Sequence, residues 1–122
     1  MKKLILQTLS GSNMAGYNWV TNVVMTERKN GYFSLRAIQV SDEPQIYKTP
    51  RIYPIKNATE LWLAIEAVFQ DDLMSDIAIN WEEIIKIVDE CFVELGIKLR
   101  IIFLEKEFEK LLEVEAKQKI NL

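Results

Sequence analysis

The sequence predicts an α+β domain in which an antiparallel sheet of about four strands is followed by two or three helices. Residues 3–56 are rich in Val, Thr, Trp and Tyr and are interrupted by turn residues, which is typical of strands. Residues 57–117 carry apolar residues at helical spacing. Because the strands do not alternate with the helices, and 122 residues is the length of one domain, we expect a single domain over residues 1–122.

The first three strands are expected at Lys3–Leu9, Tyr17–Arg28 and Tyr32–Val40. The first is a short apolar run, and residues 10–16, which contain Ser, Gly, Asn and Met, are expected to form the loop after it. The other two strands flank Lys29-Asn30-Gly31, a sequence typical of a hairpin turn.

A turn at residues 41–44 leads to a fourth extended segment, Gln45–Ile55. Pro50 and Pro54 have no backbone N–H to donate to a neighbouring strand. The segment is therefore expected to be an edge strand or an interrupted one.

The register of the hairpin follows from how well it separates apolar from polar residues. A two-residue loop, Asn30-Gly31, places Lys29 opposite Tyr32 and mixes both faces. A three-residue loop with a left-handed Gly31 places Arg28 opposite Tyr32 and is preferred. One face then collects Trp19, Val23, Met25, Phe33, Leu35 and Ala37. The other collects Asn18, Asn22, Thr26, Arg28, Tyr32, Ser34 and Arg36, with Val20, Val24 and Ile38 among them.

Two Asn-x-x-Glu patterns predict where the first two helices begin. Asn57 with Glu60, and Asn80 with Glu83, are typical of capping boxes. The first helix is expected over about residues 57–70, and the second over about 80–95, with Gly96 as its C-cap. The apolar residues at helical spacing are Leu61, Trp62, Ala64, Ile65, Val68 and Phe69 in the first helix and Trp81, Ile84, Ile85, Val88, Cys91, Phe92 and Leu95 in the second.

A third helix is expected at about residues 98–117. The residues expected to face the core are Ile101, Leu104, Phe108, Leu111 and Leu112. Its beginning, Leu99–Phe103, is equally compatible with a strand, because β-branched and aromatic residues cluster there. In a helix, Ile102 and Phe103 lie off the core stripe, and with Leu99 and Leu112 they form an apolar patch that a homodimer would bury.

The composition indicates the cellular compartment in which the protein is expected. The single cysteine, Cys91, cannot form an internal disulfide and fits a reducing compartment. No apolar run approaches the roughly 20 residues that span a bilayer, so no membrane association is expected. The N-terminal run is basic and then apolar, but Gln7 and Thr8 end it too early for a signal peptide. We therefore expect a cytoplasmic protein.

Residues that carry catalytic or metal chemistry form no recognisable motif. The chain has no histidine, no Gly-rich phosphate loop and no Ser nucleophile elbow. Cys91 lies on an apolar helix stripe and is expected to be a buried structural thiol. The acidic residues Asp71, Asp72 and Asp76, with Glu82 or Glu83, match no calcium loop and suit the start of a helix. We expect no enzyme activity, no metal and no cofactor.

The charges divide unevenly along the chain. Residues 1–60 carry eight basic and four acidic residues, and residues 61–122 carry seven and 14. This distribution suits a ligand surface on the basic half, although small domains often have uneven charge. The candidate binding residues are Arg28, Tyr32, Arg36, Tyr47, Arg51 and Tyr53. Cations that contact phosphates and rings that stack on bases are what a single-strand platform requires. The same residue types also anchor protein interfaces or form a solvated strand surface.

Four strands followed by a helix, with an arginine on the third strand, resemble the single-stranded-DNA-binding fold of the "positive cofactor four" type, shared in outline by Whirly proteins. Phe33-Ser34-Leu35-Arg36 stands roughly where that family has an aromatic or acidic residue, an aliphatic residue and then Arg. Asn57-Ala58-Thr59-Glu60-Leu61-Trp62 resembles the family's helix start. Thr49-Pro50-Arg51 stands where the family has a Lys-Gly pair. The resemblance covers about residues 3–70 and implies DNA binding on a curved sheet.

The leading hypothesis is therefore a small non-enzymatic protein that binds single-stranded nucleic acid on a basic, tyrosine-rich sheet face. The alternative is an inhibitor or immunity-type module that binds a protein partner through its acidic helices or the sheet face, since an acidic surface imitates nucleic acid toward a basic partner. Asp71, Asp72, Glu82, Glu83 and Asp89 are the carboxylates available for that alternative.

Overall fold

The computed structural model describes residues 2–43, 50–73 and 77–120. It confirms the α+β architecture, with a four-stranded antiparallel sheet in the order β1-β2-β3-β4 followed by three α-helices. The strands are β1 (Lys3–Ser12), β2 (Asn18–Glu27), β3 (Phe33–Ser41) and β4 (Tyr53–Ile55). The helices are α1 (Ala58–Ala67), α2 (Trp81–Cys91) and α3 (Val93–Ile120), with a 3₁₀ turn η1 (Lys29–Gly31) and a π-turn η2 (Val68–Asp72).

The hairpin β2–β3 has the predicted register. Met25 lies opposite Leu35, and the backbone N–H of Arg28 donates to the carbonyl of Tyr32 at 2.7 Å. Asn30 and Gly31 in the turn both have left-handed backbones, with φ of 63° and 76°. Gly and Asn tolerate this region best, which is why the three-residue turn forms here. The register separates an apolar face from a polar face, as the sequence predicted.

Strand β1 is longer than predicted, because residues 10–12, expected in a loop, continue the ladder with β2. Hydrogen bonds between polar side chains reinforce this pairing: Thr8 Oγ1 donates to Asn22 Oδ1 at 2.7 Å, and Ser12 Oγ donates to Asn18 Oδ1 at 2.8 Å. Strand β4 occupies the edge of the sheet beside β3, where the prolines of this segment were predicted to place it.

Both predicted helix caps form. Asn57 Oδ1 accepts from the N–H of Glu60 at 2.9 Å, and Asn80 Oδ1 accepts from the N–H of Glu83 at 3.4 Å. The predicted end of the second helix is wrong. Helix α2 ends at Cys91, and the chain turns at Phe92, whose backbone is not helical. Gly96 lies in the first turns of α3 and is not a C-cap.

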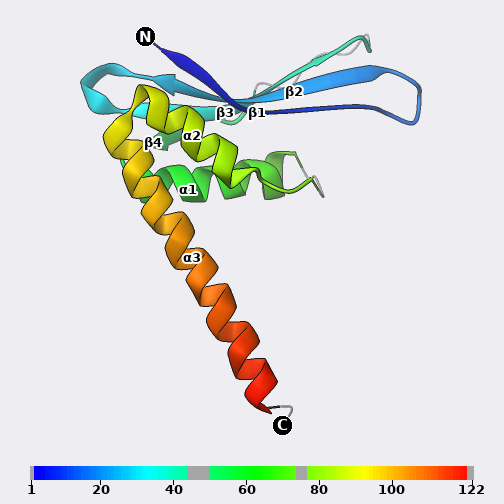
Figure 1. Ribbon diagram of the computed structural model, residues 1–122. Coiled ribbons are helices and arrows are strands. Elements are labelled where there is room, and N and C mark those ends of the chain that lie inside the picture. The colour runs from blue at the N-terminus through cyan, green and yellow to red at the C-terminus, as the bar shows by residue number, and fades with distance from the viewer. Residues whose placement is uncertain (1, 44–49, 74–76, 121–122) are drawn as a thin grey trace.

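All three helices lie on the same side of the sheet (Figure 1). Helix α1 contacts β3 and β4, and α2 contacts β1. The core lies between these layers, and the stacked rings of Trp62 and Trp81, 3.7 Å apart, join α1 to the start of α2. The largest fully buried side chains are Leu6, Met25, Leu35, Ile55, Leu61, Ile65, Ile84, Ile85 and Leu99.

Helix α3 presents to the core a different face from the one predicted. Leu99–Phe103 is helical, with Leu99 fully buried and Ile102 and Phe103 packed against the core. Ile101 and Leu104, which were expected to serve the core, are exposed, as are Phe108, Leu111 and Leu112. Leu99, Ile102 and Phe103 of the predicted patch are therefore covered within the chain, whereas Leu112 remains exposed. Within the described residues, none of the helices has the apolar stretch that a bilayer-spanning segment requires.

Candidate nucleic-acid interface

The face of the sheet opposite the helices carries three of the predicted binding residues. Arg28 and Tyr32 lie opposite each other where the hairpin turns, and Arg36 lies opposite Val24. Alternation along the strands places all three on the polar face, away from Leu35 and the core. We call this surface the open face.

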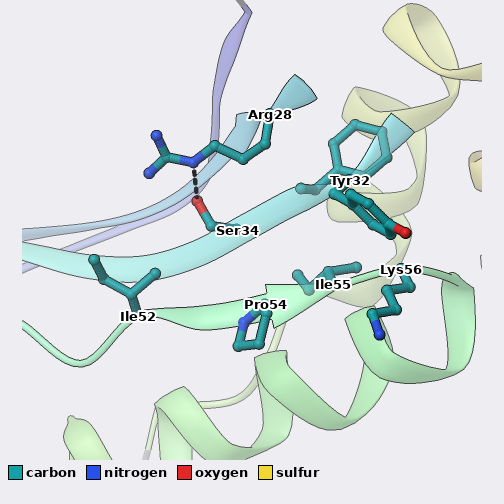
Figure 2. Close-up of a pocket in the computed structure, with 8 residues that line it drawn as sticks. Arg28, Tyr32, Ser34, Ile52, Pro54, Ile55 and Lys56 are labelled. Carbon is teal, nitrogen blue, oxygen red and sulfur yellow. Dashed lines mark hydrogen bonds between the residues drawn. The ribbon is translucent and has the colours of Figure 1, made fainter. Parts of the chain in front are cut away.

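A groove of about 320 Å³ opens on this face between β3 and β4. Figure 2 shows Arg28 and Ser34 on the β3 side, Ile52 and Pro54 along β4, and Tyr32 with Lys56 at one end. The walls are almost wholly apolar, and the charged groups lining the groove are those of Arg28 and Lys56. Such a surface suits a flat apolar group bearing negative charge at its edge.

Hydrogen bonds and ring contacts hold the charged side chains of the groove in place. Arg28 Nε donates to Ser34 Oγ at 3.0 Å, which directs the guanidinium along β3. The Nζ atom of Lys56 lies 5.9 Å from the centroid of the Tyr32 ring, within cation–π range. Each contact fixes a cation beside the groove without neutralising it.

The open face is positively charged. Lys3, opposite Thr26 in the β1–β2 ladder, adds a cation to those of Arg28, Arg36 and Lys56. In the described parts of the chain, these four side chains form no ion pair with a carboxylate. The Nε atom of Arg36 is buried and has no hydrogen-bond partner among the described residues. Their charge is therefore available to an anionic ligand.

Arg51 and Tyr53 do not join this surface, which corrects the prediction that they share it. Tyr53 lies opposite Leu35 and packs against the core on the helix side of the sheet. Arg51 Nη1 donates to Tyr53 Oη at 3.4 Å and lies 3.9 Å from Asp72 Oδ1 in η2. Burial and a hydrogen bond with Asp72 raise the pKa of Tyr53. The sixth predicted residue, Tyr47, lies outside the described residues.

Lys56, Ile52 and Pro54 belong to the groove but were not predicted as binding residues. Lys56 immediately precedes the Asn57 cap, and its backbone N–H donates to Glu60 Oε2 at 2.9 Å. The capping box therefore fixes the position from which the lysine side chain reaches Tyr32. The feature of the sequence that could have identified Lys56 is its position directly before a helix cap, at the end of an edge strand.

The described residues offer little support for thiol chemistry or metal binding. Cys91 is a free thiol at the end of α2 and is only half-buried, less than predicted. Within residues 2–43, 50–73 and 77–120, no three side chains of the His, Cys, Asp or Glu type gather where they could hold a metal ion. Asp76, considered above with Asp71 and Asp72, lies outside these ranges.

Comparison of the chain with protein-family models, with curated proteins and with solved structures finds no match.

Proposed function

We propose that this protein binds single-stranded nucleic acid on the open face of its sheet. The observation that carries the proposal is the apolar groove between β3 and β4, with Tyr32 at one end and with Arg28 and Lys56 as its charged lining residues. The resemblance of the sequence over about residues 3–70 to the "positive cofactor four" type implies the same ligand.

The groove accounts for binding of a base. A nucleobase is flat and has two apolar faces, and stacking on an aromatic side chain contributes about 1–3 kcal/mol per base without sequence preference. Tyr32 is 46% exposed and offers such a ring, while Ile52 and Pro54 provide apolar contacts along β4. An unpaired strand can present a base in this way, whereas a duplex keeps its bases stacked inside.

The cations account for binding of the backbone. Arg28, Arg36, Lys56 and Lys3 surround or extend the groove on one face and have no carboxylate partner among the described residues. Each phosphate that they contact releases a condensed counterion, so affinity depends on salt concentration. With three or four contacts on a single strand, log K against log salt has an expected slope of about −2 to −3.

The test is the binding of a fluorescently labelled thymidine oligonucleotide, followed by anisotropy over a salt series, with a duplex of the same length for comparison. The proposal predicts tighter binding to the single strand and a slope near the value above. Absence of binding at low salt, where such contacts are strongest, rules the proposal out.

A second candidate function is that of a protein-binding inhibitor, and exposed acid groups on the helix side favour it. Glu82 and Glu83 in the first turn of α2 are exposed and form no ion pair within the described residues. Asp72, by contrast, is paired with Arg51. Reversing the charge of Glu82 and Glu83 should slow association with a basic protein several-fold at low salt. A partner that is captured equally by the reversed variant contradicts this alternative.

A further inference from the structure

The outer part of α3 has no neighbour within the described chain. Figure 1 shows this helix leaving the body of the molecule and ending far from the sheet. Its 28 residues make it about 42 Å long. Its contacts with the body end near Phe103, and every residue from Leu104 to Gln118 is exposed.

Large apolar side chains nevertheless follow one side of this helix. We call them the exposed stripe: Ile97, Ile101, Leu104, Phe108 and Leu111, which are between 51% and 67% exposed. They are separated by steps of four, three, four and three residues, an average of 3.5. This is the repeat of a coiled-coil seam, which keeps facing a partner helix as the two helices wind around each other.

The start of α3 is apolar on two sides, and only one of them is covered. Leu95, Leu99, Ile102 and Phe103 pack against the body, whereas Ile97 and Ile101 point to solvent. A helix that is apolar all round is normally covered all round. The second apolar side therefore needs a partner that the described part of this chain does not provide.

We propose that the exposed stripe pairs with the same stripe of a second copy of this chain in a parallel, two-stranded coiled coil. Burying the five side chains in both copies removes on the order of 1,000 Å² from water, which is about the lower limit for a biological interface. Leu112 and Val114 flank Leu111 and are also exposed, so they widen the contact at its outer end.

The short length of the stripe does not weigh against this pairing. Short isolated helices are marginal in water because helix nucleation is unfavourable. Here the body already anchors the first turns of α3 through Leu99, so the helix exists before the copies meet. Dimer formation therefore has to offset only the free-energy cost of pairing two helices, and not the cost of forming them.

The charges beside the stripe favour the parallel arrangement. When the two stripes are parallel and in register, Arg100 of one copy lies beside Glu105 of the other, and this opposite-charge pair forms twice. An antiparallel pairing centred on Leu104 places Arg100 beside Glu107 of the other copy, but it also brings the Glu105 side chains of the two copies together, where like charges repel.

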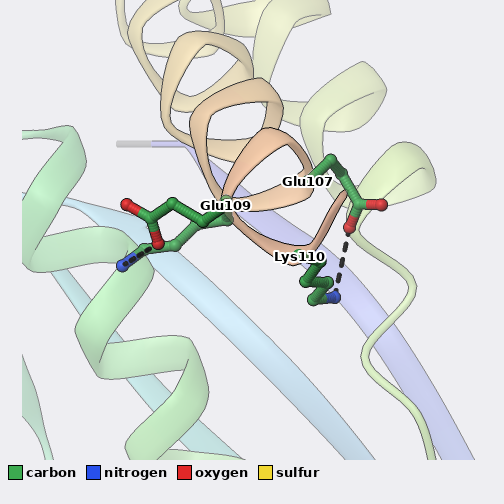
Figure 3. A network of polar contacts seen from close by, with 4 residues as sticks. Glu107, Glu109 and Lys110 are labelled. Atoms are coloured by element: carbon green, nitrogen blue, oxygen red, sulfur yellow. Dashed lines mark hydrogen bonds and ion pairs between the residues drawn. The ribbon is translucent and has the colours of Figure 1, made fainter. Parts of the chain in front are cut away.

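In the outer part of α3, the side opposite the stripe is polar, and several of its charges are paired within the chain. Figure 3 shows the two ion pairs, Lys106 with Glu109 at 3.9 Å and Lys110 with Glu107 at 3.2 Å. At 100° per residue, Lys106, Glu109 and Lys110 lie across the helix from Leu104. This side suits solvent, which leaves the stripe as the side for a partner.

The test is the mass of the full chain in solution, measured by sedimentation or light scattering over a range of concentrations. We expect the wild type to have twice the mass of the 14.2 kDa chain, and Leu104→Lys to raise the dimer dissociation constant by about tenfold or more. Leu63→Lys on α1 is the matched control, because Leu63 is also 58% exposed but lies off the stripe. Circular dichroism verifies that both variants fold.

The orientation is tested by exchanging charges. Arg100→Glu alone and Glu105→Arg alone should each weaken the dimer, and the two changes together should restore it. A wild type that stays at the mass of one chain overturns the proposal, and so does equal weakening by Leu104→Lys and Leu63→Lys. Failure of the double exchange to restore the dimer overturns the parallel arrangement.

Discussion

A Cβ atom placed on Gly96 would lie 2.6 Å from the Cα atom of Asp89. Asp89 is in α2 and Gly96 is in the first turns of α3, so this contact sets how closely the two helices pack after the chain turns at Phe92. Gly96 has an ordinary helical backbone and is needed for the space that it leaves. This contact fixes the direction in which α3 leaves the body.

Gly96→Ala should therefore lower the free energy of unfolding, by about 1–3 kcal/mol, because α3 must move away from backbone atoms of α2. Helix propensity alone predicts the opposite effect, an increase of about 1 kcal/mol in the free energy of unfolding. Thermal or urea unfolding of the two proteins distinguishes these outcomes. A stabilised Gly96→Ala protein would show that the contact is loose.

The side chain of Gln7 joins the sheet to the start of α2. Its Oε1 accepts from the N–H of Asn80 at 2.9 Å, and its Nε2 donates to the carbonyl of Ala78 at 3.2 Å. Gln7→Ala removes both bonds at a site open to water, so we expect a loss of about 1–2 kcal/mol in the free energy of unfolding. Unfolding in urea measures it, and Gln39→Ala on the exposed end of β3 is the control.

Tyr53 should make stability fall at alkaline pH. Burial and the hydrogen bond with Asp72 raise its pKa in the folded protein above the value of about 10 that it has when unfolded. Below pH 10 the phenol is neutral in both states and its contribution is complete. Above pH 10 the unfolded state ionises first, so this contribution is lost as pH rises.

Tyr53→Phe removes the group that ionises, so its free energy of unfolding should decrease less steeply than that of the wild type above pH 10. Urea unfolding of both proteins at neutral and alkaline pH measures the difference between the two slopes. Parallel curves for the two proteins would contradict the role assigned to Tyr53.

Tyr32 is the aromatic residue of the proposed site. Tyr32→Ala should weaken binding of a thymidine oligonucleotide by about 1–3 kcal/mol, the loss of one stacked base. Tyr32→Phe keeps the ring and should bind nearly as well as the wild type. Anisotropy titrations at one salt concentration provide the comparison, and similar weakening by both variants would argue against stacking.

Much of the fold could be predicted from local signals. The hairpin register followed from the segregation of side chains, and the Asn57 and Asn80 caps followed from spacing alone. The end of α2 could not be predicted, because a glycine that ends a helix and one that allows a close helix contact look alike in sequence. The core-facing side of α3 was mispredicted because a seam of period 3.5 looks the same whether it meets the chain's own core or solvent.

The candidate site was predicted only in part, because the sequence specifies the register of some of its strands and not of others. A long hairpin with one buried face has a strongly specified register, so Arg28, Tyr32 and Arg36 could be placed on one surface. Strand β4 has only three residues, and its register depends on packing that no local pattern encodes. Asp72 in η2 then attracts Arg51 toward the helix side, a contact between segments 21 residues apart in sequence.

Two arginines on opposite sides of the sheet allow the most direct test of nucleic-acid binding. Arg28 lines the groove on the open face, and Arg51 lies beside Asp72 on the helix side. The measurement is the affinity of the wild type, Arg28→Gln and Arg51→Gln for a labelled thymidine oligonucleotide at low salt. The proposed site predicts that Arg28→Gln weakens binding by about tenfold, the loss of one charge-assisted contact, while Arg51→Gln binds like the wild type. Equal weakening by the two variants, or a wild type that does not bind, would contradict it.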